Sequence, residues 1–315
     1  MSRKKSNMQK NLITLMSLLL LAFTLTACPG RATTTSEARV MTDREGHTIT
    51  VPTQINTIVT LGPSNTEVLV ALGFADKIIA TDRFAAGVAG LGANVPRDFG
   101  FMDFDVEYII DLMPDIIFVT GMTRVHGDDD PMAPISAVGI TIIYKPTSVS
   151  LAAIMEDIRF IADVMGVKNT GETIISNMRT EINAIRQIAA SITETRTVYF
   201  EISPAPWMVS FGRGTFLNEM IELVGATNIF ADHDGWMGVS EEVLLELNPD
   251  VILTSVDFLV DPIAEIKERP GFNALAAVQN NAVFPIDTAA SNRPTHNVII
   301  ALRQIAESVF PEYFK

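Results

Sequence analysis

The sequence predicts an α/β fold with two sheet-based lobes joined by a long helical connector. Three observations predict it. Short apolar segments alternate with helical patterns, which is typical of parallel sheets built from strand–helix units. Two stretches, one in each half of the chain, repeat the same helix–turn–strand pattern. Between them lies a proline-free segment, Thr147 to Ile192, with apolar residues at helical spacing.

The first residues have the pattern of an export signal. A basic flank precedes an apolar run from Leu12 to Leu25, which is too short for a comfortable membrane span. Leu25-Thr26-Ala27-Cys28 resembles the bacterial lipobox, in which the cysteine is acylated and becomes the mature N-terminus. We therefore expect a lipoprotein signal peptide over 1–27 and acyl chains on Cys28 that hold the protein on the outer face of a bacterial membrane, or in a periplasm. The alternative is a chance cysteine near an ordinary cleavage site.

Composition narrows the class of partner. The chain carries −14, and removal of the four basic leader residues gives −14 − 4 = −18 for the mature part. This charge argues against a nucleic-acid partner, which would need a basic face. Residues 28–39 are mostly small and polar and predict a flexible tether. Because Cys28 is the only cysteine, the exported part must fold without an internal disulfide.

The N-terminal lobe is expected over 40–146. It starts with a strand at 56–62, a helix at 64–73 and a second strand at 76–82. Ser64-x-x-Glu67 fits a capping box, so Glu67 is assigned to capping the helix.

The internal repeat joins this lobe to a C-terminal lobe expected over 194–315. "DVEYIIDLMPDIIFVT" (105–120) and "SEEVLLELNPDVILTS" (240–255) both predict a helix, a Pro-Asp turn and a buried strand. The plainer interpretation is that any α/β protein reuses such units. Aligning the two Pro-Asp turns, and so Asp115 with Asp250, aligns two further pairs: Glu107 with Glu242, and Phe101 with Trp236.

The connector is expected over 147–193 as one long helix. Its apolar residues recur at helical spacing, and Gly166 and Gly171 are the expected points of a break or kink. A helix between lobes bends less easily than extended strands, so we expect limited closure on a ligand.

These features together resemble the helical-backbone substrate-binding proteins of ABC importers, which serve cobalamin, ferric siderophores and haem. The resemblance covers nearly the whole mature chain, including "VTLGPSNTEVLVALG", "GTFLNEMIELVGATNIF" and "NNAVFPID…NRPTHNVIIALRQIAESVFPE". It implies a lipoprotein without enzymatic activity or cofactor of its own. Such a protein captures a metal chelate in a cleft between its lobes and delivers it to a permease dimer; the cobalamin-binding members look somewhat nearer.

The resemblance also implies site residues. Glu107 and Glu242 match glutamates that meet arginines on the permease; the plainer interpretation is that each acid favours a helix N-terminus. Flat aromatic side chains and an arginine suit a corrin or a catecholate chelate, with core packing as the alternative for the aromatics. The residues implied for the ligand cleft are Phe101, Trp207, Trp236, Arg293 and, near the place of an expected tyrosine, Arg83.

Other functions are weaker interpretations. The histidines are scattered and show no paired ligand spacing, so bare metal capture is not expected, although His233 ahead of Trp236 leaves haem ligation open. The acidic stretch at 126–131 does not have the spacing of an EF-hand loop. An anchored enzyme lacks a G-x-S-x-G or H-E-x-x-H motif to support it, and a structural lipoprotein is the remaining alternative.

Overall fold

The computed structural model describes residues 38–124 and 130–314. Cys28, the expected signal peptide and His126 lie outside these residues. The first strand begins at Arg39, a residue that the sequence analysis assigned to the tether. No helix within the described part is long and apolar enough to cross a membrane.

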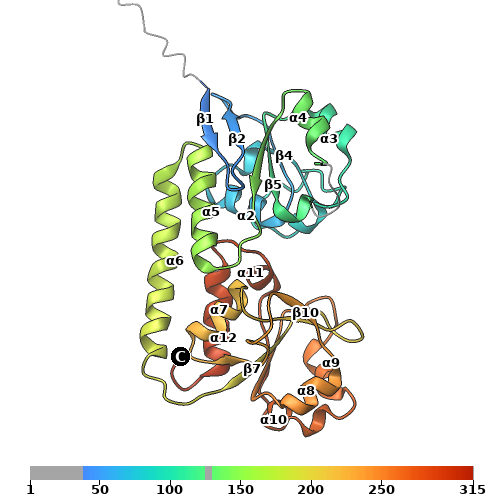
Figure 1. Ribbon diagram of the computed structural model, residues 1–315, viewed down its shortest axis with the longest axis vertical. Coiled ribbons are helices and arrows are strands. Elements are labelled where there is room, and N and C mark those ends of the chain that lie inside the picture. Colours follow the sequence, from blue (N-terminus) through green and yellow to red (C-terminus); the bar gives the residue numbers. More distant parts are fainter. Residues whose placement is uncertain (1–37, 125–129, 315) are drawn as a thin grey trace, which may run out of the picture. The chain divides into compact units, whose positions relative to one another are not determined.

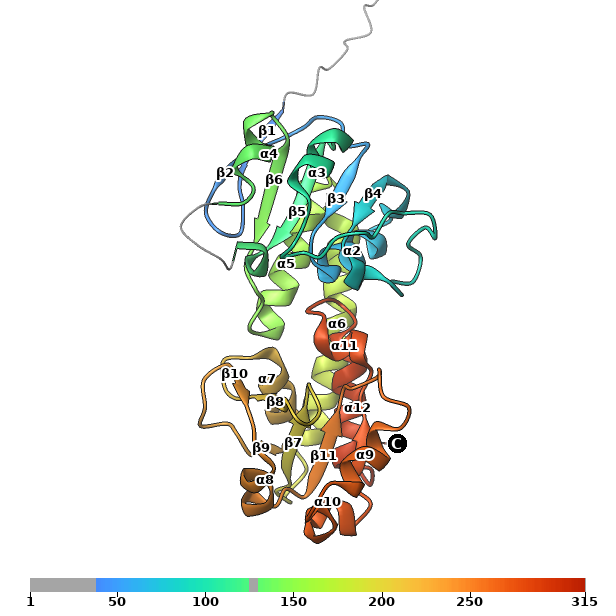
Figure 2. The same ribbon diagram turned by 90° about the vertical axis from the view of Figure 1, so that its right-hand side faces the viewer.

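The N-terminal lobe has a β1–β2 hairpin (Figure 1) beside a four-stranded parallel sheet in the order β4-β3-β5-β6 (Figure 2). Side chains of β5 alternate between two cores: Ile116 and Phe118 face the connector side, and Ile117 faces the opposite side. The strands are β1 (Arg39–Thr42), β2 (Thr48–Val51), β3 (Ile58–Thr60), β4 (Ile78–Thr81), β5 (Ile116–Thr120) and β6 (Thr141–Lys145). The helices are α2 (Pro63–Ala71), α3 (Val106–Leu112) and α4 (Ala133–Ala137).

The C-terminal lobe repeats this plan with a parallel sheet in the order β12-β11-β7-β9 and a separate antiparallel pair, β8 and β10 (Figure 2). The strands are β7 (Thr197–Glu201), β8 (Val209–Phe211), β9 (Thr227–Asn228), β10 (Trp236–Gly238), β11 (Val251–Thr254) and β12 (Val283–Pro285). The helices are α7 (Phe216–Leu223), α8 (Glu241–Leu247), α9 (Pro262–Glu268), α10 (Ala276–Gln279), α11 (Thr288–Asn292) and α12 (Val298–Val309). Short 3₁₀ turns lie at Ala75–Lys77, Arg83–Ala85, Gly121–Arg124 and Phe272–Ala274.

The internal repeat predicted from the sequence is present in the structure. Helices α3 and α8 both end at a residue in the left-handed region, Met113 (φ 43°) and Asn248 (φ 45°). The aspartate after each proline then binds a threonine at the start of a neighbouring strand. Asp250 Oδ2 accepts a hydrogen bond of 2.8 Å from the Thr197 N–H. In the other repeat, Asp115 Oδ2 accepts a hydrogen bond of 3.0 Å from the Thr57 N–H. The same turn therefore connects each helix to its sheet.

The connector is two helices and not one. Helix α5 (Leu151–Val164) and helix α6 (Lys168–Ala189) pack side by side, and the chain turns at Gly166, whose φ of +73° favours glycine (Figure 1). The predicted long helix between the lobes is α6, and the expected break at Gly166 separates it from α5. Gly171 breaks nothing: it lies inside α6, where an added Cβ would be 2.5 Å from Ala162 Cβ. Its function is to let the two helices approach closely.

One hydrophobic cluster joins the connector to both lobes. It includes residues of β5, α5, α6, β7 and α12, so α6 is packed against other elements along its length. A continuous packed core resists bending more than a peptide hinge does.

The assignment of Glu67 to a capping box is wrong. Helix α2 begins at Pro63, a residue that suits the first helical position, and it has no side-chain cap because its N-cap residue is Gly62. Ser64 therefore lies inside the helix. The buried Glu67 carboxylate instead accepts hydrogen bonds from the loop before α12, 2.9 Å from Thr295 Oγ1 and 2.8 Å from Asn297 Nδ2.

Candidate functional site

A cavity of about 830 Å³ lies between the lobes. Both lobes line it, mainly with the loops that follow the carboxyl ends of the parallel strands, which is where open α/β sheets bind ligands. The lining residues used below are Ser64, Phe84, Phe101, Thr120, Met122, Lys145, Thr147, Ser148, Ile202, Trp236, Asp257, Asn292 and Arg293.

The wall from the N-terminal lobe carries an aromatic pair. The rings of Phe84 and Phe101 meet edge to face, with centroids 5.4 Å apart. Phe84 is held by Asp82, which follows β4: the Phe84 N–H donates to Asp82 Oδ1 at 2.9 Å, and the Gly62 N–H donates to Asp82 Oδ2 at 2.8 Å. Burial raises the pKa of Asp82, and the charge of Arg293 opposes that rise. One carboxylate thus fixes both the aromatic turn and the start of α2.

The wall from the C-terminal lobe carries Trp236. This residue opens β10 and pairs with Phe211 of β8, whose ring it meets edge to face at 5.8 Å. Phe211 is fully buried, while Trp236 is 52% exposed. The buried ring holds the indole at the cavity, where it offers a flat face of the kind that binds planar ligands.

Arg293 crosses from one lobe to the other. Its Nη2 donates to the carbonyl oxygens of Phe84 at 2.9 Å and Ala86 at 3.4 Å. The arginine therefore lines the cavity and also ties the loop after α11 to the aromatic turn of the N-terminal lobe.

The structure brings three of the five expected ligand residues to the cavity: Phe101, Trp236 and Arg293. Trp207 is 81% exposed and is not among the lining residues. Arg83 is also outside the lining and pairs with Asp103 at 3.0 Å. Phe84 and Lys145 line the cavity but were not among the expected ligand residues, although Phe84 follows β4 and Lys145 ends β6 at the carboxyl edge of the sheet, a position that could have identified them.

Glu107 and Glu242 occupy equivalent places on the repeated helices. Each lies in the first turn and is exposed, and each helix is N-capped by the residue two before the glutamate. The Ser240 hydroxyl lowers the pKa of Glu242. Neither glutamate forms an ion pair with any residue in 38–124 or 130–314. Both carboxylates are thus accessible to a basic partner, and each also suits the helix N-terminus on which it lies.

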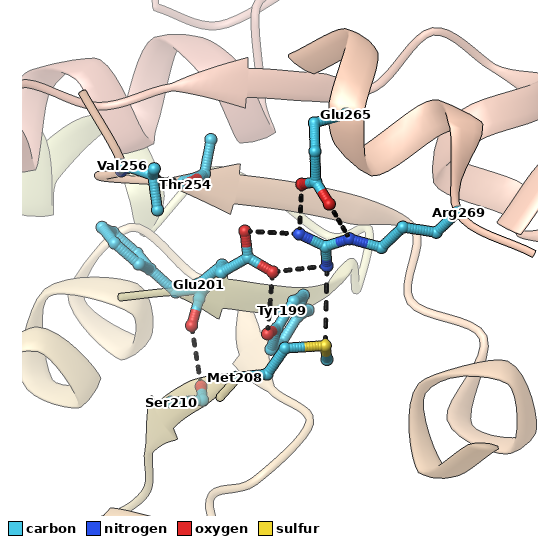
Figure 3. A network of polar contacts seen from close by, with 9 residues as sticks. Tyr199, Glu201, Met208, Ser210, Thr254, Val256, Glu265 and Arg269 are labelled. Atoms are coloured by element: carbon cyan, nitrogen blue, oxygen red, sulfur yellow. Dashed lines mark hydrogen bonds and ion pairs between the residues drawn. The ribbon is translucent and has the colours of Figure 1, made fainter. Parts of the chain in front are cut away.

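A buried ionic network supports the C-terminal wall (Figure 3). Arg269 makes a bidentate pair with Glu201 at 2.6 and 3.1 Å and a second with Glu265 at 2.9 and 2.5 Å. Burial raises the pKa of Glu201, and the bonds from Arg269 oppose that rise. Glu201 ends β7 directly before Ile202, which lines the cavity, so the network anchors this wall from behind.

The described residues offer little for holding a bare metal ion. No group of three or more His, Cys, Asp or Glu side chains in 38–124 and 130–314 is placed to bind one. Among the described lining residues, Met122 and Asp257 are the side chains with a ligating sulfur or carboxylate.

Comparison with known proteins agrees with this geometry. A family model described as "Periplasmic binding protein" matches residues 58–290. An uncharacterized ABC transporter substrate-binding lipoprotein, YvrC of Bacillus subtilis, is 27% identical over 87% of this chain and 86% of its own. A vitamin B12-binding protein of Vibrio cholerae is 26% identical over 79% of this chain and 87% of its own. The periplasmic haem-binding protein RhuT of Roseiflexus, solved in apo form, has a TM-score of 0.70 and 23% identity, and the match covers 81% of this chain and 98% of that one.

Proposed function

Because this chain belongs to the periplasmic binding protein family, whose model matches residues 58–290, we propose that it captures a metal chelate, either a corrinoid or a ferric siderophore. It is a non-enzymatic, extracytoplasmic substrate-binding protein of the ABC-importer type, in the group that includes binders of B12, haem and siderophores. The chelate binds between the lobes and is delivered to the permease.

The aromatic walls carry this proposal. Phe84 and Phe101 face the cavity from one lobe and Trp236 from the other, so a flat or ring-bearing ligand contacts an aromatic surface on both sides. A cavity of about 830 Å³ is within the range of small-molecule sites, which are mostly apolar with a few placed polar groups. The relatives named for vitamin B12 support a corrinoid.

Chelates whose metal is already fully coordinated suit this lining best. The described lining holds no histidine, tyrosine or cysteine, and Met122 is its one residue of a type that ligates haem iron. Haem binding by His233 is the alternative left open above; His233 is not among the lining residues, so Met122 would be the residue that ligates the iron.

Delivery is proposed to use Glu107 and Glu242. Their equivalent places on α3 and α8 support a contact in which a two-fold symmetric permease meets one carboxylate on each lobe. The acylated Cys28 would hold the protein at the membrane, close to that permease.

The test is a calorimetric titration of the purified protein with cyanocobalamin, a ferric trihydroxamate, a ferric tricatecholate and haem. We expect saturable binding of one of the first three at one molecule per chain. Tight binding of haem alone, lost in Met122→Leu, would replace the proposal with the haem alternative. Hydrolysis or conversion of a bound chelate would contradict a pure binding function.

A further inference from the structure

The carboxyl ends of β5 and β6 form a polar corner of the cavity. Thr120 and Lys145 are paired across the two strands, and Thr147 and Ser148 follow directly. All four residues line the cavity, on the wall opposite the C-terminal lobe. The Thr120 hydroxyl is buried and makes no hydrogen bond within the described residues. This corner was not predicted by the sequence analysis.

Lys145 places a buried positive charge at this corner. The residue is 3% exposed, and its Nζ lies 3.2 Å from Asp157 Oδ2. Asp157 also accepts 3.0 Å from Arg44 Nε and a hydrogen bond from the Ser148 hydroxyl. Two cations thus share one carboxylate, and the cluster of Lys145, Arg44 and Asp157 carries +2 − 1 = +1.

Asp43, which accepts a hydrogen bond from the neighbouring Tyr144 N–H, does not pair with Lys145. The Asp43 carboxylate accepts hydrogen bonds from the N–H groups of Glu45, His47 and Tyr144, and from the His47 ring at 3.0 Å. An ammonium group has three donors, and Lys145 makes one hydrogen bond within the described residues. A buried charge with unused donors is costly unless a further acceptor meets it.

The ionic network of the C-terminal lobe is the opposite case. Arg269 is closed between the two carboxylates of Glu201 and Glu265, and none of the three lines the cavity (Figure 3). That network is complete without a ligand. Lys145, in contrast, lines the cavity and keeps donors that no described residue uses.

We propose that Lys145, with the hydroxyls of Thr120 and Thr147, forms a subsite for an anionic oxygen group of the ligand. The group is a phosphate, a carboxylate or a deprotonated phenolate, and the aromatic walls hold the ring-bearing remainder. This inference rests on the proposed function and narrows it to chelates that bear an exposed anionic oxygen. It is independent of Arg293, which already donates to two carbonyl groups.

The experiment compares ligands that bear an anionic oxygen group with ligands of related size that lack it. Cyanocobalamin carries a phosphodiester in its nucleotide loop, and dicyanocobinamide is the corrinoid without that loop. The anionic ferric tricatecholates and the cationic ferric complex of desferrioxamine B form the second pair. Affinities of the parent, Lys145→Met and Lys168→Met are measured by calorimetry at low and high salt. Lys168 is the control, because its side chain is 66% exposed and lies outside the cavity lining.

We expect Lys145→Met to bind the anion-bearing ligand at least about tenfold more weakly than the parent does, which corresponds to about 1.4 kcal/mol of binding free energy. The affinity of Lys145→Met for the paired ligand without the anion should differ from that of the parent by less than about twofold. Lys168→Met should bind both ligands with the affinity of the parent. The loss should depend only weakly on salt, because buried charges are little screened.

Equal affinities of the parent and Lys145→Met for an anion-bearing ligand would overturn the subsite and leave the proposed function standing. If a thermal melt shows that Lys145→Met does not fold, the affinities of the parent protein for the two ligands of a pair are compared instead. Equal affinity for both ligands overturns the subsite, and tighter binding of the anionic ligand supports it. Failure of the parent to bind any chelate would overturn the proposed function and the subsite with it.

Discussion

Thr295 Oγ1 donates a hydrogen bond of 2.9 Å to the buried carboxylate of Glu67, and this bond joins the two lobes directly. Glu67 lies on α2, and Thr295 lies in the loop between α11 and α12. The same loop also places Arg293 against the carbonyl groups of the N-terminal lobe. The lobes are therefore connected on one side by α6 and by a polar loop contact beside it. Limited closure on the ligand follows from these two attachments, and it stays a prediction.

The first prediction concerns His296, between the two residues that bind Glu67. Burial lowers the pKa of His296 below its usual value, and the Glu67 charge opposes that shift. Below about pH 6.5, the ordinary pKa of histidine, the unfolded chain therefore binds a proton that the folded chain does not. Stability should fall as the pH drops from about 6.5 through the folded pKa.

Urea unfolding at several pH values between about 7 and 5 measures this effect. His296→Gln should show a smaller decrease of the unfolding free energy over that range than the parent does. His233→Gln, which removes an exposed histidine, is the matched control. An unchanged pH dependence in His296→Gln would show that the buried imidazole does not contribute.

The second prediction concerns docking. Reversal of both Glu107 and Glu242 to Lys should reduce uptake through the permease and leave ligand affinity within about twofold. One exposed pair contributes only about 0–1 kcal/mol, but several charges in one interface contribute more. Uptake should therefore fall further in the double variant than in either single variant.

Asp111→Lys with Glu246→Lys is the matched control for docking. These acids lie one turn further along the same helices, are exposed, and occupy equivalent places in the repeat. An equal loss in this control would indicate a general effect of charge. Normal uptake by the Glu107 and Glu242 reversal would remove these residues from the interface.

The third prediction concerns the aromatic walls. Truncation of Phe101 or Trp236 to Ala removes roughly 60–100 Å² of contact, worth about 1.5–2.5 kcal/mol at about 25 cal/mol per Å². Affinity for the chelate should fall about ten- to seventy-fold in calorimetry. Trp207→Ala should change affinity by less than about twofold, because that side chain is outside the cavity lining. Parent-like affinity of folded Phe101→Ala and Trp236→Ala would mean that neither ring contacts the ligand.

The fourth prediction concerns the anchor. Cys28→Ser should release the mature protein from the membrane or leave an unprocessed precursor, because serine cannot receive the thioether-linked lipid. Fractionation of cells and the mass of the N-terminal peptide measure both outcomes. A correctly processed Cys28→Ser protein that stays in the membrane fraction would contradict acylation at this residue.

Local patterns predicted the parts of the fold that depend on local chemistry. The two Pro-Asp turns were predictable because each follows a short amphipathic helix and precedes a buried apolar strand, and the repeat then placed Phe101 and Trp236 in equivalent positions. The break at Gly166 was predicted, but glycine alone did not single it out, because Gly171 carried the same expectation and lies inside α6. That α5 and α6 pack against each other was not predictable, because it depends on the close approach of Gly171 to Ala162.

Contacts distant in sequence were not predictable from such patterns. Glu67 fitted a capping box, but its partners Thr295 and Asn297 are 228 and 230 residues away. In the sequence, nothing distinguishes Lys145 from any other lysine at the end of a strand. Its environment depends on Arg44 and Asp157, which come from a loop before β2 and from α5.

The central claim is that a metal chelate binds between the aromatic walls. Native mass spectrometry with absorbance, applied to the parent and to Phe101→Ala with Trp236→Ala after incubation with the ligand panel, tests it most directly. We predict one chelate per parent chain, identified by its mass and spectrum, and little or none on the double variant. The absence of any chelate on the parent, or equal occupancy of the two proteins, would contradict the claim.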